Sequence, residues 1–131
     1  MRFAQRDYIG IREGKNTLKD IVVSFFKEEG FRVHWAEHEK TYLVQATKGG
    51  VFRPVLGNDR AFSVLIEGND VNPKIRIGIT KLIENPKDND IRKIATHPSS
   101  EYLEIPESMW TYEMEHHLWH YVETQVGLSG N

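Results

Sequence analysis

The fold of this chain is decided by residues 18–35, which read LKDIVVSFFKEEGFRVHW. Apolar residues recur at helical spacing in the first half of this stretch, and they are Leu18, Ile21, Val22, Phe25 and Phe26. Positions i, i+3, i+4, i+7 and i+8 form one apolar stripe of an amphipathic helix. Gly30 can end this helix in the left-handed conformation, and from Phe31 onward the apolar period switches to two, as in a β-strand. The stretch therefore predicts a helix that leads directly into a sheet.

The segment before this helix carries weaker signals. Residues 1–10 show no clear period, and Gly10 and Gly14 favour an irregular lead-in. Asn16 or Thr17 is expected to cap the helix, because a short side-chain oxygen can accept a hydrogen bond from an unpaired backbone N–H.

Alternating apolar and polar residues predict five strands after the helix. These strands cover residues 31–36, 42–47, 51–56, 61–66 and 74–80. Gly49 and Gly50 are expected in a tight hairpin turn, with positive φ at one of them at least. Pro54 cannot donate a ladder hydrogen bond, so it favours an edge or bulged strand at that point. The short connections between the strands indicate an antiparallel meander with one apolar and one mixed face.

The last third of the chain closes the fold with a second helix. Residues 84–100 are rich in turn formers and are expected to be a loop, in which Ile91 and Ile94 could support one helical turn. A helix is predicted over residues 108–126, and Gly127 is expected to end it. Helix, meander and helix together predict a single α+β domain over residues 1–131, built as a two-layer sandwich.

The helical and strand periods agree on one shared core. The residues expected to be mostly buried in it are Phe31, Val33, Trp35, Val44, Val64, Ile66, Ile75, Ile77 and Ile79 from the sheet, and Leu18, Val22, Phe25, Phe26, Leu118 and Val122 from the helices. This agreement predicts that both helices pack on the apolar face of the sheet.

Composition narrows the classes of function. The 131 residues include no cysteine, which excludes disulfides, thiol catalysis, Fe–S clusters and Cys-ligated zinc. The first residues lack the apolar stretch of a secretory signal, and no run approaches the roughly 20 apolar residues of a membrane span. A cytoplasmic protein is therefore expected.

The net charge of −2 hides a segregation along the chain. Residues 40–81 carry seven basic and three acidic groups, a balance of +4, whereas residues 101–131 carry six acidic groups and no Lys or Arg. This pattern predicts one basic and one acidic region, unless the solvated faces acquired their charges independently. Strand cations such as Arg53 and Arg76 can hold single-stranded nucleic acid, but a pI near 6.3 argues against a dedicated binder. Nucleic acid is therefore not expected as a partner.

The densest set of chemistry-bearing side chains lies on the predicted C-terminal helix. His116 and His120 are one turn apart, Glu113 and Glu123 lie a turn to either side, and all four fall within about 80° of one another. Two imidazoles at this spacing can share a metal such as zinc, and carboxylates can complete the shell. His97, in the preceding loop, is a further candidate ligand. An ordinary solvated helix face carries the same residue types, and under that alternative no cofactor is expected.

Other catalytic arrangements are not indicated by the sequence. The serines lie in no nucleophile elbow, and Gly49-Gly50 precedes a strand, whereas a phosphate-binding glycine loop opens a helix. His34 and His38 flank Trp35 and are expected to be an outward strand residue and a turn residue. The sequence leaves enzymatic activity open and favours a chain that is not an enzyme.

One stretch resembles known domains. Residues 48–66 read KGGVFRPVLGNDRAFSVLI, and residues 75–81 read IRIGITK. With these motifs, residues 18–126 are similar to a group of uncharacterised prokaryotic α+β domains that share a Lys-Gly-Gly hairpin and an Ile-Gly strand ahead of an aromatic closing helix. The resemblance implies the same fold. It implies no activity and no functional residue.

The sequence favours a non-enzymatic binding module, whose sheet and last helix meet a protein partner or a second copy of the chain. The alternative from another class is a metal-binding protein or metal-dependent hydrolase that uses His116 and His120. A third alternative is a carrier of a small apolar ligand, because two helices over a curved sheet can enclose a cavity. The concavities of the structure, and the side chains that line them, separate these alternatives.

Overall fold

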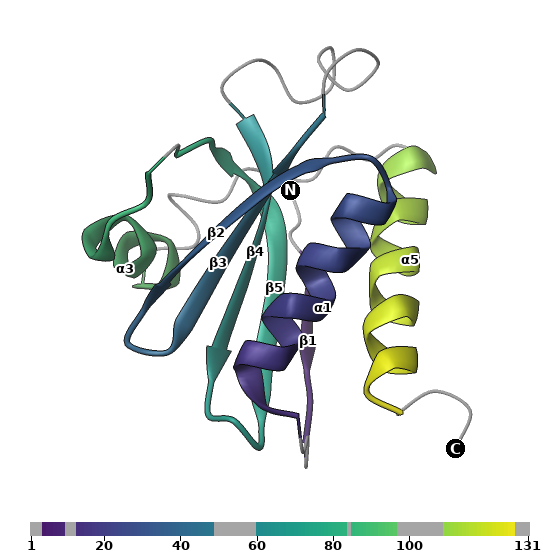
Figure 1. Cartoon of the computed structure of the whole chain (residues 1–131), viewed down its shortest axis with the longest axis horizontal. Helices are drawn as coiled ribbons and strands as arrows, with labels where there is room; N and C mark the ends of the chain where they lie inside the picture. Colours follow the sequence, from purple (N-terminus) through teal and green to yellow (C-terminus); the bar gives the residue numbers. More distant parts are fainter. Residues whose placement is uncertain (1–3, 10–12, 49–59, 84, 97–108, 128–131) are drawn as a thin grey trace.

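A five-stranded antiparallel sheet forms the centre of the molecule (Figure 1). The structure is a computed structural model that describes residues 4–9, 13–48, 60–83, 85–96 and 109–127. The strands are β1 (Ala4–Asp7), β2 (Arg32–His38), β3 (Thr41–Thr47), β4 (Arg60–Gly68) and β5 (Pro73–Lys81), in the spatial order β1-β5-β4-β3-β2. The predicted antiparallel meander is confirmed for β2 to β5, because each of these strands pairs with the next along the chain.

The edge of the sheet next to β5 differs from the prediction. β1 pairs antiparallel with β5, although residues 1–10 are predicted to be irregular. The four residues of β1 carry no alternating pattern of their own, so their strand is defined by the partner that they meet. The strand predicted at residues 51–56 and the turn predicted at Gly49-Gly50 lie outside the described residues.

Helices cover both faces of the sheet. α1 (Gly14–Glu28) and α5 (Met109–Gln125) lie on one face, and α3 (Asp88–Thr96) lies on the other (Figure 1). The α+β class, with an N-terminal and a C-terminal helix, is confirmed. The prediction of a loop over residues 84–100 is wrong where α3 forms, and α3 adds a third layer to the predicted two.

A small second core holds α3 on the sheet. Ile91 and Ile94 are buried against Leu43 and Leu65 of β3 and β4. Two apolar residues in a nine-residue helix are too few to establish a helical period in the sequence. The helix is therefore stabilised mainly by its tertiary packing, as short helices usually are.

The main core lies between the sheet and helices α1 and α5. The residues predicted there that are buried are Phe31, Val44, Val64, Ile66, Ile75, Ile77, Ile79, Leu18, Val22, Phe25, Phe26, Leu118 and Val122. Val33 is half-buried, and the prediction is wrong for Trp35, which is 47% exposed. β2 is an edge strand, and there the Trp35 ring packs on Tyr42 and under Lys19 Nζ, which lies 3.7 Å from the ring centroid. The alternation of apolar residues in a strand shows which face they lie on, but it does not show which of them a helix covers.

The two ends of α1 are fixed in different ways. Gly30 has a φ of +87°, which confirms the predicted left-handed end. At the start, the backbone N–H of Lys15 donates to Asp70 Oδ1 at 3.1 Å. The predicted cap at Asn16 or Thr17 is wrong, because the acceptor comes from the β4–β5 turn.

The β2–β3 hairpin turns on two non-glycine residues with positive φ, Glu39 (+48°) and Lys40 (+64°). Positive φ at both central residues is typical of a type I′ turn, which matches the right-handed twist of the flanking strands. Side chains other than Gly, Asn or Asp are disfavoured in this conformation, so the turn lowers the stability of the hairpin.

Candidate interaction groove

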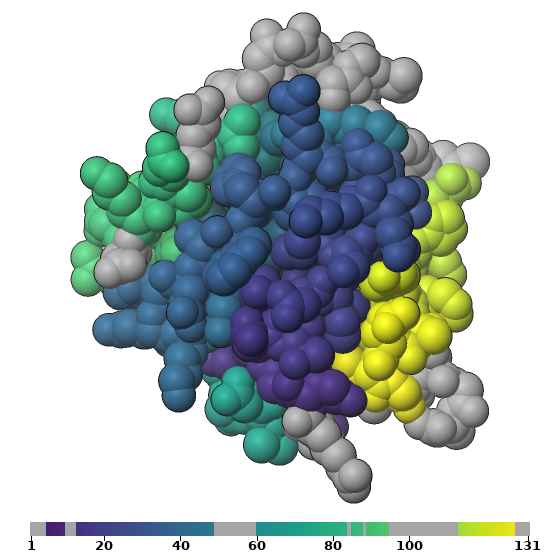
Figure 2. Space-filling model, viewed as in Figure 1, coloured from purple at the N-terminus to yellow at the C-terminus, as the bar shows by residue number. Residues whose placement is uncertain are grey.

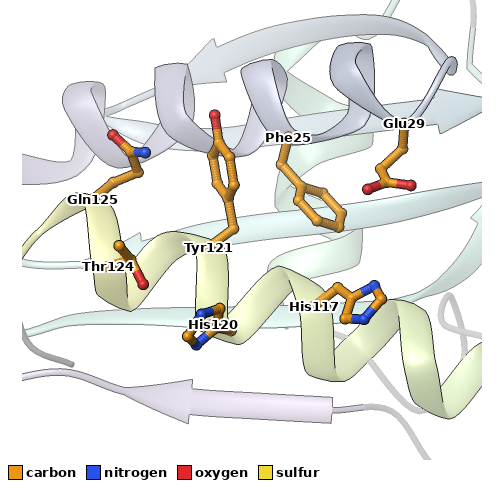
Figure 3. A pocket seen from close by; sticks show the side chains of 7 residues that line it. All are labelled: Phe25, Glu29, His117, His120, Tyr121, Thr124 and Gln125. Atoms are coloured by element: carbon orange, nitrogen blue, oxygen red, sulfur yellow. The ribbon is translucent and has the colours of Figure 1, made fainter. Parts of the chain in front are cut away.

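α1 and α5 lie antiparallel and side by side on one face of the sheet (Figure 1, Figure 2). A groove runs between them. Its volume is about 220 Å³. The residues that line it are Phe25 and Glu29 at the C-terminal end of α1, and His117, His120, Tyr121, Thr124 and Gln125 of α5 (Figure 3). Two helices from opposite ends of the chain thus build one concave surface.

Two aromatic rings form the floor of this groove. Phe25 points from α1 toward α5 and Tyr121 points from α5 toward α1, with ring centroids 5.5 Å apart (Figure 3). The Tyr121 hydroxyl donates to Glu28 Oε1 at 3.4 Å. Burial and the adjacent Glu28 carboxylate raise the pKa of Tyr121 above its usual value, so the phenol stays neutral. The floor is therefore ring surface with one neutral hydroxyl at its edge.

The α5 side of the groove belongs to a stripe of exposed polar side chains, Glu113, His117, His120 and Thr124, of which the last three line the groove. Their spacing of four, three and four residues places them within about 60° of one another around the helix. This is the spacing with which a helix faces a neighbouring helix. A polar rim around an aromatic centre is the usual anatomy of a protein–protein contact site.

The side chains of the predicted metal site on α5 have different surroundings in the structure. His116 and His120 are both exposed, and His120 also lines the groove. Glu123 instead meets β1, where its Oε1 lies 3.4 Å from Arg6 Nη1. Within the described residues no three His, Asp or Glu side chains are placed to hold a metal ion, and His97 lies outside those residues. A metal site on this helix stays a prediction.

Sequence reasoning identified the histidine face of α5 but missed Glu29, His117 and Tyr121 as parts of one groove. The polar stripe at four-three-four spacing is the signal that could have revealed this side of α5. The sequence gives no such signal for Phe25 and Glu29 of α1, because the apolar pattern of a helix does not indicate which other helix packs beside it.

A second polar cluster lies on the opposite face of the sheet. Gln45, Ser63 and Thr80 are buried, and Gln45 Nε2 lies 3.1 Å from each of the two hydroxyl oxygens. His34, predicted as an outward residue, is half-buried, with Nε2 2.8 Å from Ile83 O and 3.1 Å from Gln45 Oε1. The carbonyl can only accept, so Nε2 carries the proton. These groups satisfy one another, and we assign the cluster a structural role.

Among the described strand residues, Arg76 and the aromatic Phe62 could serve nucleic-acid binding, and both are used within the protein. Arg76 is buried and pairs with Glu67. Phe62 is 1% exposed and belongs to the main core, while Arg53 lies outside the described residues. A platform for single strands needs exposed rings and cations, which Phe62 and Arg76 do not provide.

A second hollow, of about 380 Å³, lies where the end of β1 meets the β4–β5 turn. Asp7, Glu67, Asn69 and Lys74 contribute to its walls. Asn69 Oδ1 already accepts two hydrogen bonds from the backbone of its own turn, and Glu67 pairs with Arg76. Two polar groups in the walls of this hollow are thus already engaged within the protein.

No family model, curated protein or solved structure matches the chain. The resemblance of residues 18–126 to prokaryotic domains therefore stays a prediction. Among the helices of the described segments, none combines the length and the apolar character that a membrane crossing requires. The function is accordingly argued from the groove itself.

Proposed function

We propose that the chain is a non-enzymatic protein-interaction module and that the groove between α1 and α5 receives a helix of its partner. The observation that carries this proposal is the aromatic floor, framed by exposed polar side chains. The residues that dominate protein interfaces are aromatic, lie in central pockets and are ringed by weaker polar contacts. A helix in a groove is one of the common modes of peptide recognition. The cytoplasmic location expected from the sequence is part of the proposal.

The volume of the groove favours a side chain over a small molecule as its occupant. About 220 Å³ is below the roughly 300–1,000 Å³ of pockets that enclose a drug-sized ligand. One large apolar side chain of a partner fits this space. The region between the sheet and the helices is filled by buried side chains such as Leu18, Phe26 and Val64, which gives the apolar-ligand carrier less support.

The metal-binding alternative rests on His116 and His120, which are exposed one helical turn apart. A single helix supplies only two of the four ligands that a tetrahedral zinc ion prefers. Binding at such a pair is weak, and zinc titration, described below, separates the two hypotheses.

Photo-crosslinking at defined positions tests the proposed function. A photoreactive phenylalanine at Gln125, in the groove, is expected to capture a protein in living cells, whereas the same residue at the exposed Lys93 of α3 is not. The captured protein is then purified, and calorimetry measures its affinity for the full chain.

The decisive variant in that measurement is Thr124→Trp, which fills the groove with an indole ring. It should weaken partner binding at least about tenfold, which corresponds to about 1.4 kcal/mol. The control is Asn16→Trp, at an exposed position that lies about half a turn around α1 from Phe25. The proposal is wrong if both tryptophan variants bind like the parent, or if Lys93 captures the same protein as efficiently as Gln125.

A further inference from the structure

We infer that the helix received by the α1/α5 groove is cationic, an amphipathic segment in which Lys or Arg residues flank one large apolar anchor. The inference rests on the proposed function and adds the chemistry of the partner. It follows from the sign of the charges around the groove and from the directions in which the neighbouring cations point.

Carboxylates lie along the α1 side of the groove, and one more lies on α5 a turn beyond the lining residues. Glu29 lines it, and Glu28 lies at its edge, 3.4 Å from the Tyr121 hydroxyl. On α5, Glu113 continues the polar rim one turn before His117. All three carboxylates are on exposed residues, and α5 contains no Lys or Arg. Anionic groups therefore stand on the α1 side of the aromatic floor and, on α5, one turn beyond the lining residues.

The described cations on α1 and next to the two helices are directed elsewhere. Lys15 Nζ donates to Gly68 O, and Lys19 pairs with Asp20. Lys27 lies about 200° from Phe25 around α1, on the side away from the groove. Lys48 Nζ donates to the backbone carbonyl oxygen of Glu29 at 2.9 Å, at the end of the helix. Arg6 pairs with Glu123 from β1. Over the described residues, the groove thus keeps an excess of negative charge.

The same charges argue against other occupants. Nucleic acids and anionic membranes present phosphates, which these carboxylates repel. A second copy that docked through its own α5 would bring like charges together, because that helix is acidic as well. A cationic helix is attracted instead, which speeds its association and fixes its orientation. Its apolar anchor would cover Phe25 and Tyr121, while the aliphatic stems of its Lys or Arg residues cover the rim.

Two synthetic helical peptides of about 18 residues, roughly five turns, test this inference. Both carry the same leucine-rich face with one tryptophan, and the remaining positions are Lys in one peptide and Glu in the other. Fluorescence anisotropy with the full chain should show that the Lys peptide binds at least about tenfold more tightly than the Glu peptide. Its affinity should fall as salt rises from about 0.05 to 0.5 M, because ions screen exposed charges.

Two double variants locate the attraction. Glu28→Gln/Glu29→Gln should weaken the Lys peptide roughly 3- to 30-fold, since each exposed ion pair contributes a few-fold. The matched control is Glu13→Gln/Glu39→Gln, which removes two exposed carboxylates at the start of α1 and in the β2–β3 turn. This control removes the same two negative charges from the chain and should leave the affinity unchanged. Thermal melts verify that each variant is folded.

The outcomes separate the inference from the proposed function. Equal affinity of the two peptides, with both lost in Thr124→Trp, would refute a cationic partner and leave the groove as the binding site. Binding of the Lys peptide that survives Thr124→Trp, or that falls equally in both double variants, would show unspecific attraction and refute the inference. Failure of both peptides to bind refutes it as well, while crosslinking from Gln125 decides the proposed function independently.

Discussion

Gln45, in the middle of β3, is the residue whose replacement tests the buried polar cluster most directly. Its side chain is fully buried. Nε2 donates to Lys81 O at 2.9 Å, and Oε1 accepts from the N–H of Ile83 at 2.9 Å. These bonds fix the segment that leaves β5 toward α3. Gln45→Met keeps the approximate length and volume of the side chain and removes these two bonds, together with those to His34, Ser63 and Thr80.

The magnitude follows from which groups find new partners. The Thr80 hydroxyl lies 3.2 Å from Lys81 O and can take over that donation. His34 Nε2 keeps its bond to Ile83 O at 2.8 Å. The N–H of Ile83 loses the acceptor that Gln45 supplies, which costs about 1–3 kcal/mol. Loss of the bond from Gln45 Nε2 to Lys81 O lowers the free energy of unfolding by about 1 kcal/mol more. The free energy of unfolding should therefore fall by about 2–4 kcal/mol.

Urea unfolding, followed by tryptophan fluorescence, measures this change in the free energy of unfolding. For a chain of 131 residues, the melting temperature should fall by roughly 6–20 °C. The matched control is Gln125→Met, which makes the same change at an exposed position and should stay within about 0.5 kcal/mol of the parent. A loss below about 0.5 kcal/mol for Gln45→Met, at an unchanged urea dependence, would refute the argument from the lost acceptor.

Tyr8→Phe should keep or raise stability by about 1 kcal/mol at pH 7, because the buried Tyr8 hydroxyl has no hydrogen-bond partner among the described residues. Burial and the nearby Glu123 raise the pKa of Tyr8 far above its usual value. Above about pH 10, where the phenol ionises in the unfolded chain, the parent should therefore lose stability faster than the variant. Urea midpoints of both proteins at several pH values measure this difference. Glu39→Asn/Lys40→Gly should raise the calorimetric melting temperature, with a gain of about 1–2 kcal/mol, and an unchanged value would contradict the strain assigned to this turn. Zinc titration should show only weak binding, and this binding should be absent in His116→Ala/His120→Ala. It should weaken toward pH 5, because ligation needs neutral imidazoles. Sub-micromolar affinity would favour the metal hypothesis.

The elements that the sequence predicts correctly are those that depend on their own residues. The apolar stripe of α1, its end at Gly30 and the alternation of β2 to β5 are local patterns, and the structure contains them. β1, α3 and the cap of α1 depend on distant partners. β1 requires β5, α3 requires Leu43 and Leu65, and the cap comes from Asp70. Contacts with distant residues produce no periodic pattern in the sequence, so these elements could not be predicted from it.

The candidate site divides in the same way. The exposure of His116 and His120 follows from helical geometry, because Leu118 and Val122 face the core from the other side of α5. The groove requires in addition that α1 and α5 are neighbours, and this placement depends on how both helices pack on the sheet. Phe25 illustrates the limit, since the sequence predicts it correctly as a core residue but gives no sign that it also floors a groove.

α5 carries a charge pattern that an isolated helix disfavours, and this suggests one further experiment. Its last turn has no basic residue, and Glu123 lies near the C-terminus, where the helix dipole opposes an anion. Arg6 of β1 offsets part of this cost from 3.4 Å away. Gln125→Lys would place a cation at this end and should stabilise the free chain by about 0.3–1 kcal/mol.

Gln125 also lines the groove, so the same lysine should repel a cationic partner. The affinity for the Lys peptide should fall roughly threefold, the effect of one exposed charge, while the melting temperature rises by a few degrees at most. The same added charge would then raise the stability of the chain and lower its affinity for the peptide. This opposition is expected at a surface whose residues are selected for binding rather than for stability. A variant that is more stable but binds the Lys peptide as tightly as the parent would contradict a cationic partner in this groove.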